Sequence, residues 1–365
     1  MENRKPKVLW ITNVANHYRV PMWKWLDERV DLTLCMLRDP ESNRFGEWTK
    51  EAIGVKTNFV HAPLVARGNR GVFFPNRALR NMLKQDFDAV ILGGWESPAY
   101  WYALFVAKKR GIRAIGHCGS TKKSSGFSKG VVARVRSWFH RKLDWSVTYG
   151  TDCTEYLVSM GVSENKITTG FNSIDNAYFL SKIAEFSEPS ESSPGHKYLF
   201  VGRLIPLKNI PNIIHAFNQI KEPNDTLRIV GSGFLKEEIL NLTSELRIKD
   251  VVKVIDHKTQ DELIQEFLQA NTLILASLFE VWGLVVNEAL VCGLHVVVGD
   301  RCGVARDIKQ MPGVQVSTCE VESIAQEMIR SRDSWHGHIS NPEILGLGVE
   351  VYGNHFLEAI LHVIR

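Results

Sequence analysis

Residues 197–220 read KYLFVGRLIPLKNIPNIIHAFNQI, and the architecture can be inferred outward from this stretch. It begins with an aromatic and β-branched run typical of a buried strand, passes a glycine turn, and continues with apolar residues at helical spacing. The same succession of strand and helix recurs at residues 226–248, 251–270 and 271–293. Strands that alternate with helices indicate parallel βαβ units. We therefore predict a parallel α/β domain over residues 197–347.

The amino-terminal half repeats this alternation. Its strand-like runs are PKVLWIT, DLTLCML, DAVILGG, RAIGHC and WSVTYG, with helical patterns between several of them. Residues 181–196 are rich in Ser, Glu and Pro and lack periodicity, as interdomain linkers do. The predicted organisation is therefore a domain at 1–180, a linker at 181–196, a domain at 197–347 and a helix at 348–365 that can pack on either domain. The predicted fold class is α/β, with two Rossmann-like, doubly wound domains facing each other across a cleft.

Composition indicates a globular, cytosolic protein. Apolar residues make up 44% of the chain and charged residues 23%, as in folded proteins. No run approaches the roughly 20 apolar residues of a membrane span. The start, MENRKPKVLW, lacks the apolar region of a signal peptide. The six cysteines are scattered without a C-x-x-C pair, which favours buried, reduced thiols.

The net charge of +4 hides an asymmetry between the halves. Residues 1–175 contain 27 Lys/Arg and 16 Asp/Glu, whereas residues 176–365 contain 17 and 24. A basic half joined to an acidic half suggests that the two meet different partners.

The turn after the first strand of the second half carries two cations. Gly202 ends the strand, and Arg203 and Lys208 follow before the next helix. A guanidinium, an ammonium and the N–H groups of a helix start together suit a diphosphate. Taken alone, such a turn is more often a solvated loop.

A second segment, SLFEVWGLVVNEA at residues 277–289, carries two carboxylates. Glu280 follows a buried strand and Glu288 lies within the next helix, so the pair can accept hydrogen bonds from sugar and ribose hydroxyls. Gly283 permits a tight turn at the helix start. Backbone N–H groups there can meet phosphate, and they belong to Val281, Trp282, Gly283, Leu284 and Val285. A third segment, VGSG, places Gly231 where backbone can approach a nucleotide.

Together these segments resemble the retaining glycosyltransferases of family 4, which have the GT-B fold. The resemblance rests on VGRLIPLKN, VGSG and EVWGLVVNEALVCG, in which Glu280 and Glu288 match the family's E-x7-E motif. It implies that Arg203 and Lys208 hold the donor diphosphate. It also implies that Glu280 contacts the transferred sugar and Glu288 the ribose.

The amino-terminal half resembles bacterial members of that family that act in polysaccharide assembly, through WITNVANHYRVPMW, ILGGWESPAY and GFNSIDNAYF. Val281 departs from the small or proline residue usual at its position, and Asn16 and His17 replace a proline- or glycine-rich loop. The resemblance implies a nucleotide-sugar donor, with UDP favoured, and a glycan or lipid-linked acceptor.

The implied reaction keeps the anomeric configuration, with the diphosphate leaving and the acceptor attacking from the same face. Preplaced cations and dipoles then stabilise the leaving group, so we expect neither a cofactor nor a metal. The resemblance implies that His117 faces the sugar, although this histidine also fits a cap on its strand end. The acceptor-side candidates are Asn16, His17, Trp95 and Glu96.

The basic half contains a long stretch without acidic residues. From Ser97 to Leu143 there are 11 Lys/Arg and no Asp or Glu. Helical spacing puts apolar residues on one side, namely Val131, Val132, Val135, Trp138, Phe139 and Leu143. The other side then carries mostly Arg134, Arg136, His140 and Arg141. Two interpretations stay open: residues 129–142 dock on an anionic membrane at the inner face of the cell membrane, or the apolar side joins the core.

Two other functions compete. A nucleotide-sugar epimerase has the same architecture, although the E-x7-E segment beside VGRLIPLKN favours transfer. A basic surface also fits a nucleic-acid binder, but no recognition motif accompanies it, and we expect no nucleic acid partner. A dehydrogenase is disfavoured because NVANHYRV follows the first strand in place of G-x-G-x-x-G.

Overall fold

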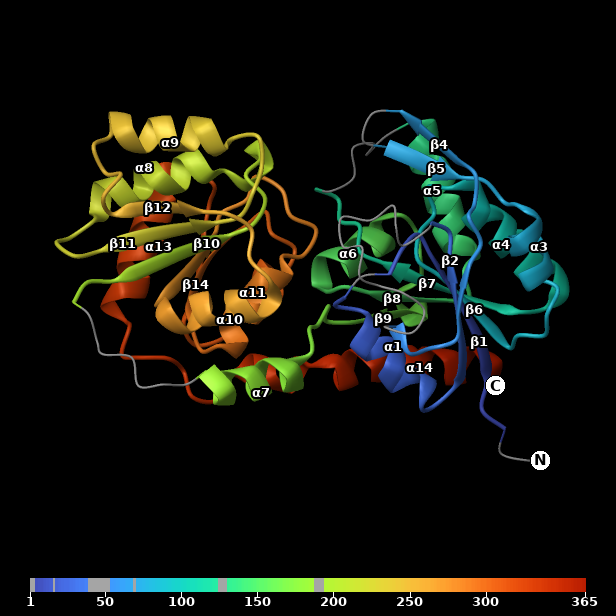
Figure 1. Ribbon diagram of the computed structural model, residues 1–365. Helices are drawn as coiled ribbons and strands as arrows, with labels where there is room; N and C mark the ends of the chain where they lie inside the picture. Colours follow the sequence, from blue (N-terminus) through green and yellow to red (C-terminus); the bar gives the residue numbers. More distant parts are fainter. Residues whose placement is uncertain (1–3, 16, 39–52, 68–69, 124–129, 187–193) are drawn as a thin grey trace. The chain divides into compact units, whose positions relative to one another are not determined.

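The protein is described by a computed structural model that covers residues 4–15, 17–38, 53–67, 70–123, 130–186 and 194–365 (Figure 1). The chain divides into two compact units. The first unit comprises Met1–Ser173 and Val349–Arg365, and the second comprises Ile174–Gly348. Both are α/β units built on a parallel sheet.

The first unit contains a parallel sheet in the order β3-β2-β1-β6-β7-β8-β9. These strands are β1 (Lys7–Thr12), β2 (Asp31–Met36), β3 (Thr57–Phe59), β6 (Ala89–Leu92), β7 (Arg113–Cys118), β8 (Trp145–Thr148) and β9 (Ile167–Thr169). A separate antiparallel hairpin pairs β4 (Leu64–Arg67) with β5 (Arg70–Phe73). The helices are α1 (Val20–Asp27), α3 (Arg77–Met82), α4 (Pro98–Arg110), α5 (Val131–Lys142), α6 (Thr151–Ser159) and α14 (Val349–Ile364), with a 3₁₀ turn at Glu164–Lys166.

Two apolar layers cover the faces of this sheet. On one face α1 and α14 lie side by side (Figure 1). Trp10, Trp23 and Phe356 are fully buried in this layer. On the other face α3, α4 and α5 contribute to a core that includes Tyr100 and Phe139. Strands covered on both faces read as near-continuous apolar runs, which is why AVIL of β6 was recognisable in the sequence.

The second unit contains a parallel sheet in the order β12-β11-β10-β13-β14-β15. Its strands are β10 (Lys197–Val201), β11 (Thr226–Val230), β12 (Val252–Ile255), β13 (Thr272–Leu275), β14 (His295–Gly299) and β15 (Val314–Ser317). Its helices are α7 (Asn176–Phe186), α8 (Ile210–Ile220), α9 (Lys236–Glu245), α10 (Gln260–Gln269), α11 (Leu284–Val291), α12 (Ala305–Ile308) and α13 (Val321–Asp333). The 3₁₀ turns are η3 (Pro206–Lys208) and η4 (Glu343–Leu347).

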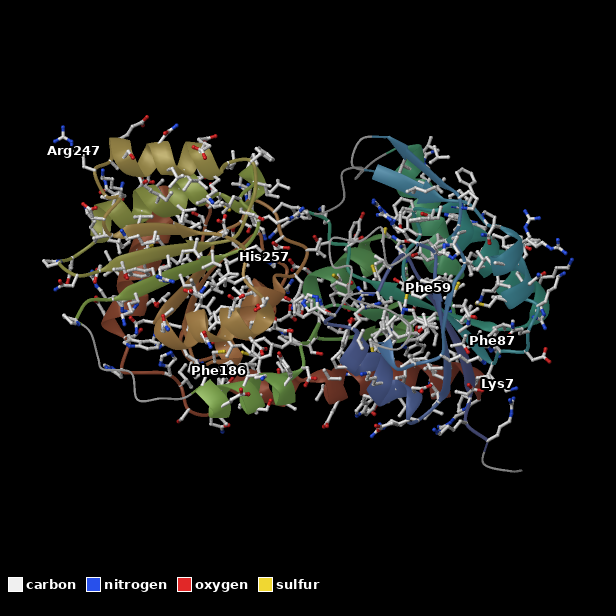
Figure 2. The ribbon with its side chains drawn as sticks, viewed as in Figure 1. Lys7, Phe59, Phe87, Phe186, Arg247 and His257 are labelled. Carbon is white, nitrogen blue, oxygen red and sulfur yellow. The ribbon has the colours of Figure 1, made fainter. Side chains whose placement is uncertain are left out.

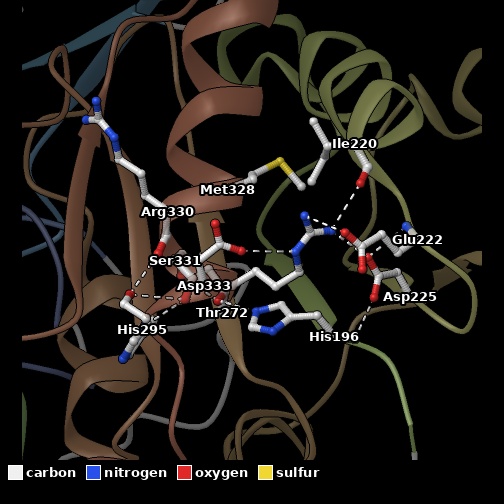
Figure 3. Close-up of polar contacts among 12 residues, drawn as sticks. His196, Ile220, Glu222, Asp225, Thr272, His295, Met328, Arg330, Ser331 and Asp333 are labelled. Atoms are coloured by element: carbon white, nitrogen blue, oxygen red, sulfur yellow. Dashed lines mark hydrogen bonds and ion pairs between the residues drawn. The ribbon is translucent and has the colours of Figure 1, made fainter.

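The sheet of the second unit has two chemically different edges. Arg247 precedes β12 and His257 follows it, and Figure 2 shows them at opposite ends of the unit. The amino edge carries a buried polar cluster (Figure 3). Arg332 donates to the carbonyl of Ile220 at 3.1 Å and to Asp225 at 3.3 Å, and His196 pairs with Thr272 at 2.8 Å. This cluster ties α13 to the starts of the strands, and the opposite edge is the one where parallel sheets bind ligands.

The boundary between the units differs from the expected linker at 181–196. Residues up to Phe186 form α7, whose Phe179 is 1% exposed and whose Tyr178 hydroxyl donates to Asp261 of α10. The Ser and Glu content of this segment concealed a helix that packs on the second unit. The final helix, α14, packs in the first unit.

Helix α5 is rotated relative to the face pattern in the sequence. Val131 and Trp138 are 73% and 47% exposed, whereas Arg136 and His140 are 4% and 6% exposed. Of the two open interpretations, the one in which the apolar side joins the core therefore holds only in part. Phe139 and Leu143 are buried, whereas the other four apolar residues of that side are exposed. The physical reason is that Arg136 packs its guanidinium over the aromatic rings of Trp95 and Tyr156.

All six cysteines lie in the described part of the chain; all are buried and none forms a disulfide, as the sequence predicted. Among the described residues, no helix combines the length and apolarity that crossing a bilayer requires.

Candidate functional site

The second unit brings its predicted residues to the point where strand order reverses. β10 and β13 are neighbours, but the chain leads from β10 toward β11 and β12, and from β13 toward β14 and β15. Loops that leave two such strands diverge at the carboxyl edge, which is the usual ligand site of open α/β sheets. Lys208 follows β10 and Glu280 follows β13.

Lys208 and Glu280 form a partly buried ion pair. The Lys208 ammonium donates a hydrogen bond to Glu280 Oε2, and the two side chains are 13% and 23% exposed. These residues are 72 positions apart in the chain. Partial burial strengthens a charge pair relative to one in open water, because water screens it less. The pair is thus a preformed cation and carboxylate at the strand ends.

Asn209 fixes the turn that carries Lys208. It adopts a left-handed conformation with φ of 57°, and it is 7% exposed. Its side-chain amide donates to the carbonyls of Ala276 at 3.2 Å and Cys319 at 2.8 Å. The Leu278 N–H donates to the Leu207 carbonyl at 2.9 Å. These bonds tie the loops after β10 and β13 to each other, so Lys208 and Glu280 are positioned by backbone.

Gly283 starts α11 in a conformation that requires glycine. Its φ is 101°, and a Cβ there would lie 2.9 Å from Leu275 Cδ2. The preceding Trp282 is 3% exposed and donates from Nε1 to Asn287 Oδ1 at 3.2 Å. The first backbone N–H groups of α11, from Leu284 and Val285, point out of the helix start and suit an anion. Val281 lies in the same loop, half-buried.

Glu288 lies one turn further along α11 and is 3% exposed. The sequence expected a ribose ligand at this position, and a carboxylate so deeply placed presents little of its surface to a ligand. Glu280 and Glu288 have the E-x7-E spacing in the sequence. A contact between Glu288 and the ribose stays a prediction.

Gly202 and Gly231 lie against each other at the ends of β10 and β11. A Cβ on Gly231 would lie 1.9 Å from the Gly202 carbonyl oxygen, and φ of Gly231 is 149°. Only glycine permits this approach. Arg203, beside this contact, is exposed, and its guanidinium has no hydrogen bond or ion pair with the described residues. The guanidinium is therefore available to a ligand.

His117, the candidate catalytic histidine, lies at the end of β7 in the first unit and is 6% exposed. Arg19 donates to its Nδ1 at 3.0 Å, so Nε2 carries the proton and donates to the Tyr352 hydroxyl at 2.8 Å. Arg19 also donates to the Tyr149 hydroxyl. Burial, followed by the Arg19 charge, lowers the pKa of His117 well below its usual value. Both ring nitrogens are thus engaged, which fits the strand-capping interpretation; contact with a sugar remains a prediction.

A cavity of about 70 Å³ lies beside His117 at the ends of β6 and β7. Its walls include Trp95, Glu96 and His140. His140 is buried and neither of its ring nitrogens has a hydrogen-bond partner among the described residues. Burial, followed by Arg136, lowers the pKa of His140 to about 4, so the ring is neutral. A cavity with an unsatisfied imidazole in its wall has room for a small polar group.

The remaining acceptor-side candidates differ in their exposure and in their contacts. Glu96 is exposed and accepts from Asn13 Nδ2 at 3.4 Å. Trp95 accepts at its carbonyl from Trp101 Nε1 at 2.6 Å, which makes it part of the packing. Burial lowers the pKa of His17 to about 4. Asn16 lies outside the described residues.

Sequence reasoning missed Arg19, Tyr149 and Tyr352, which surround His117, and it missed His140 as a cavity residue. Two of them could have been found from their place in the sequence. Arg19 follows β1 and Tyr149 follows β8 directly, so both lie at the carboxyl edge of the sheet. Within the part of the chain that the structure covers, no group of three or more His, Cys, Asp or Glu is arranged to hold a metal ion.

Residues 182–333 match the family model described as glycosyl transferases group 1. An uncharacterised glycosyltransferase of Methanocaldococcus jannaschii is 32% identical over 139 residues, 38% of this chain and 36% of that protein. Glycogen synthase of Mycobacterium tuberculosis is 25% identical over 217 residues, 57% of this chain and 51% of that protein. The chain thus spans about a third to a half of the length of these curated relatives. The second unit contains a group 1 glycosyltransferase domain, which supports the prediction of a transferase enzyme.

Solved structures similar over nearly the whole chain include a lipopolysaccharide outer core galactosyltransferase, WaaB, with a TM-score of 0.72 and 15% identity (98% of this chain, 99% of that chain). Anabaena HepE in complex with UDP gives 0.69 and 13% (98% and 97%). The UDP-GlcNAc 2-epimerase of Methanocaldococcus jannaschii gives 0.60 and 14% (97% and 99%). These likenesses confirm the predicted GT-B fold of two Rossmann-like units.

Proposed function

We propose that this protein is a retaining glycosyltransferase of family 4 of the bacterial polysaccharide-assembly type. It transfers a sugar from a nucleotide-sugar donor, with UDP favoured, to a glycan or lipid-linked acceptor in surface polysaccharide or glycoconjugate synthesis. The observation that carries the proposal is the Lys208–Glu280 pair, held by backbone at the carboxyl ends of β10 and β13. UDP is favoured because Anabaena HepE, of the same fold, was solved with UDP.

In this proposal the donor diphosphate binds between Lys208, Arg203 and the start of α11. A nucleoside diphosphate brings negative charge, so Lys208 can turn from Glu280 toward a phosphate oxygen. Glu280 is then open to accept hydrogen bonds from the sugar hydroxyls. The cations and the helix dipole stabilise the diphosphate as it leaves, and they do so without a divalent metal.

The acceptor side of the proposal uses the first unit. The cavity beside His117 and His140 has room for about one hydroxyl group and its surroundings, which suits the end of a sugar ring. Exposed Glu96 borders this cavity and can accept a hydrogen bond from an acceptor hydroxyl. We further propose a cytoplasmic protein that attaches peripherally to the inner face of the cell membrane, where lipid-linked acceptors lie.

Donor binding is the first test. UDP and UDP-sugars are expected to raise the thermal unfolding temperature of the full chain, because a ligand that binds only the folded state stabilises it. Lys208→Ala is expected to weaken UDP binding roughly 10- to 100-fold, the range for one lost charged hydrogen bond. Lys249→Ala is the matched control, since Lys249 is exposed and precedes β12. Equal UDP affinity for Lys208→Ala and wild type would refute the assignment of the diphosphate site.

Glu280 permits a sharper test, because its proposed partners are the sugar and Lys208. Glu280→Gln is expected to retain UDP binding, since a carboxylate is removed from beside the diphosphate, while sugar transfer falls roughly 10- to 100-fold. If the variant loses UDP binding and transfer in equal measure, Glu280 acts on the nucleotide and not on the sugar.

Epimerisation is the second candidate, because an epimerase shares this fold. Incubation with each UDP-sugar in the absence of acceptor separates the two activities. An epimerase converts the sugar on its own nucleotide, whereas a transferase needs an acceptor to form product. A changed sugar still attached to UDP, formed without acceptor, would select epimerisation.

A further inference from the structure

Helix α5 presents an apolar surface to solvent. Val131, Val132, Val135 and Trp138 are between 39% and 73% exposed, and they recur at helical spacing on one side. Phe105 of the adjoining α4 is 65% exposed. Scattered exposed apolar residues are common, but a contiguous group on one helix side indicates an interaction surface.

Contacts on the buried side of α5 hold the helix in the orientation that exposes these residues. Arg136 lies over the rings of Trp95 and Tyr156, at 5.3 and 5.1 Å from their centroids. The Ser137 hydroxyl donates to the Met160 carbonyl at 2.5 Å, and Phe139 is 1% exposed. Because a buried cation and aromatic ring hold the inner side, the helix cannot turn its valines inward without losing these contacts.

A hollow of about 530 Å³ accompanies the apolar side. It is lined by Trp101, Arg134, Val135, Ser137, Trp138 and Arg141. The rings of Trp101 and Trp138 stack with centroids 5.5 Å apart and an interplanar angle of 8°. The hollow therefore joins two indole rings to two guanidinium groups, an arrangement that suits a phosphate head attached to an apolar chain.

The chain segment that contains α4 and α5 carries charge of one sign, although Lys108 and Arg110 pair with Asp144 and Asp86 outside it. Residues 97–143 contain 11 Lys/Arg and no acidic residue, and Lys142 lies over the Trp138 ring at 5.5 Å. Exposed valines, indoles and cations occur together on this surface, and they are the residue types that contact the acyl, interfacial and headgroup regions of a bilayer. Aliphatic side chains offer a polynucleotide neither stacking nor hydrogen bonds, and the indoles already stack on each other. A bilayer is the better match.

We propose that the α5 surface, formed by Trp101, Val131, Val132, Val135 and Trp138 with Arg134 and Arg141, binds a bilayer that contains anionic phospholipid. Arg134 and Arg141 contact lipid phosphate at the hollow, and the valines enter the boundary of the acyl region. The biological reason rests on the proposed function, since a lipid-linked acceptor lies in a membrane. The binding itself needs no catalysis and is measured without donor or acceptor.

The test is flotation of the full chain with vesicles of phosphatidylcholine alone or mixed with phosphatidylglycerol. Wild type is expected to bind the mixed vesicles and to dissociate as salt is raised. Arg134→Gln with Arg141→Gln is expected to weaken binding roughly 25-fold, at roughly fivefold per cation. Val131→Ser with Val132→Ser is expected to weaken it roughly tenfold through lost apolar burial.

Matched controls remove the same groups elsewhere in the first unit. Lys84→Gln with Lys166→Gln removes two exposed cations, and Val158→Ser with Val351→Ser removes two exposed valines. Both controls are expected to bind as wild type does. Each variant is checked for an unchanged unfolding temperature, so that loss of binding is not loss of fold.

Three outcomes would overturn the proposal: equal binding to neutral vesicles, no binding to mixed vesicles, or equal weakening by the control pairs. Tight binding of single-stranded nucleic acid at physiological salt, lost in the α5 variants, would reassign the surface. Thermal protection by UDP, measured on the same samples, separates this proposal from the proposed function. Vesicle binding without UDP protection would support the membrane-binding surface and refute the donor site. UDP protection without vesicle binding would support the donor site and refute the membrane-binding surface.

Discussion

The imidazole of His140 is buried beside a cavity. Neither ring nitrogen has a hydrogen-bond partner among the described residues, and an unsatisfied buried polar group costs about 1–3 kcal/mol. Such a cost is expected where a group serves binding and not packing. A bound acceptor hydroxyl would satisfy the ring.

His140→Phe tests this interpretation. The free energy of unfolding is expected to stay equal or to rise by about 1 kcal/mol, because an apolar ring replaces unsatisfied polar atoms. Sugar transfer is expected to fall while UDP binding is retained. Urea unfolding and transfer assays check both, with His362→Phe as control, because His362 is exposed and keeps its ring contact with Trp145. A marked loss of stability would show that the imidazole nitrogens support the fold.

Single residues of the candidate site were predictable only where they belong to a short sequence motif. Lys208 and Glu280 belong to short motifs, so their roles could be predicted before their contact was known. His117 depends on Arg19 and Tyr352, which are 98 and 235 residues away in the chain. No local pattern encodes such contacts, because they arise only when the sheet and α14 assemble.

At the scale of elements, the glycine contact between β10 and β11 sets how closely the donor-side loops approach. Gly231→Ala is expected to lower the free energy of unfolding by at least about 2 kcal/mol, since it adds backbone strain and a clash with the Gly202 carbonyl. UDP binding is expected to weaken as β10 and β11 separate. Gly346→Ala is the control, because a Cβ there meets no atom within 4 Å. Urea unfolding of both variants measures the difference, and equal midpoints would contradict it.

Strands and helices were largely predictable, because parallel strands such as β13 and β14 are buried along their whole length and are apolar after their first residue. The side of a helix that is buried was harder to predict. The spacing of α5 identified a helix with an apolar side but not which side is buried, since Arg136 finds aromatic partners in Trp95 and Tyr156. The Ser- and Glu-rich composition likewise concealed the end of α7.

At the scale of the whole molecule, buried histidines couple stability to pH. Burial lowers the pKa of His17, His140 and His196 to about 4. Unfolded histidine titrates near 6.5, so between these values the unfolded chain binds more protons than the folded chain. The unfolding temperature is therefore expected to fall as pH is lowered from about 6.5 toward 4. Thermal scans at constant ionic strength check this, and an unfolding temperature that holds or rises would contradict it.

The first unit also depends on the last helix. Phe356 and Ile360 of α14 are fully buried against Trp10 and Trp23. Phe356→Ala is expected to cost the first unit about 3–5 kcal/mol, while UDP protection of the second unit persists. Val351→Ala, at an exposed position of α14, is the control. Loss of UDP protection in Phe356→Ala would show that the second unit does not fold independently.

Because residues 349–364 complete a core that starts at β1, synthesis and folding proceed in different orders. The ribosome delivers nearly the whole first unit, then some 175 residues of the second, before the helix that closes the first emerges. At roughly 5–20 residues per second this interval lasts roughly 9–35 s. During it, the face of the nascent sheet that α14 later covers is an apolar surface open to chaperones. Chains that stop before residue 349 would therefore be defective in the unit that was made first.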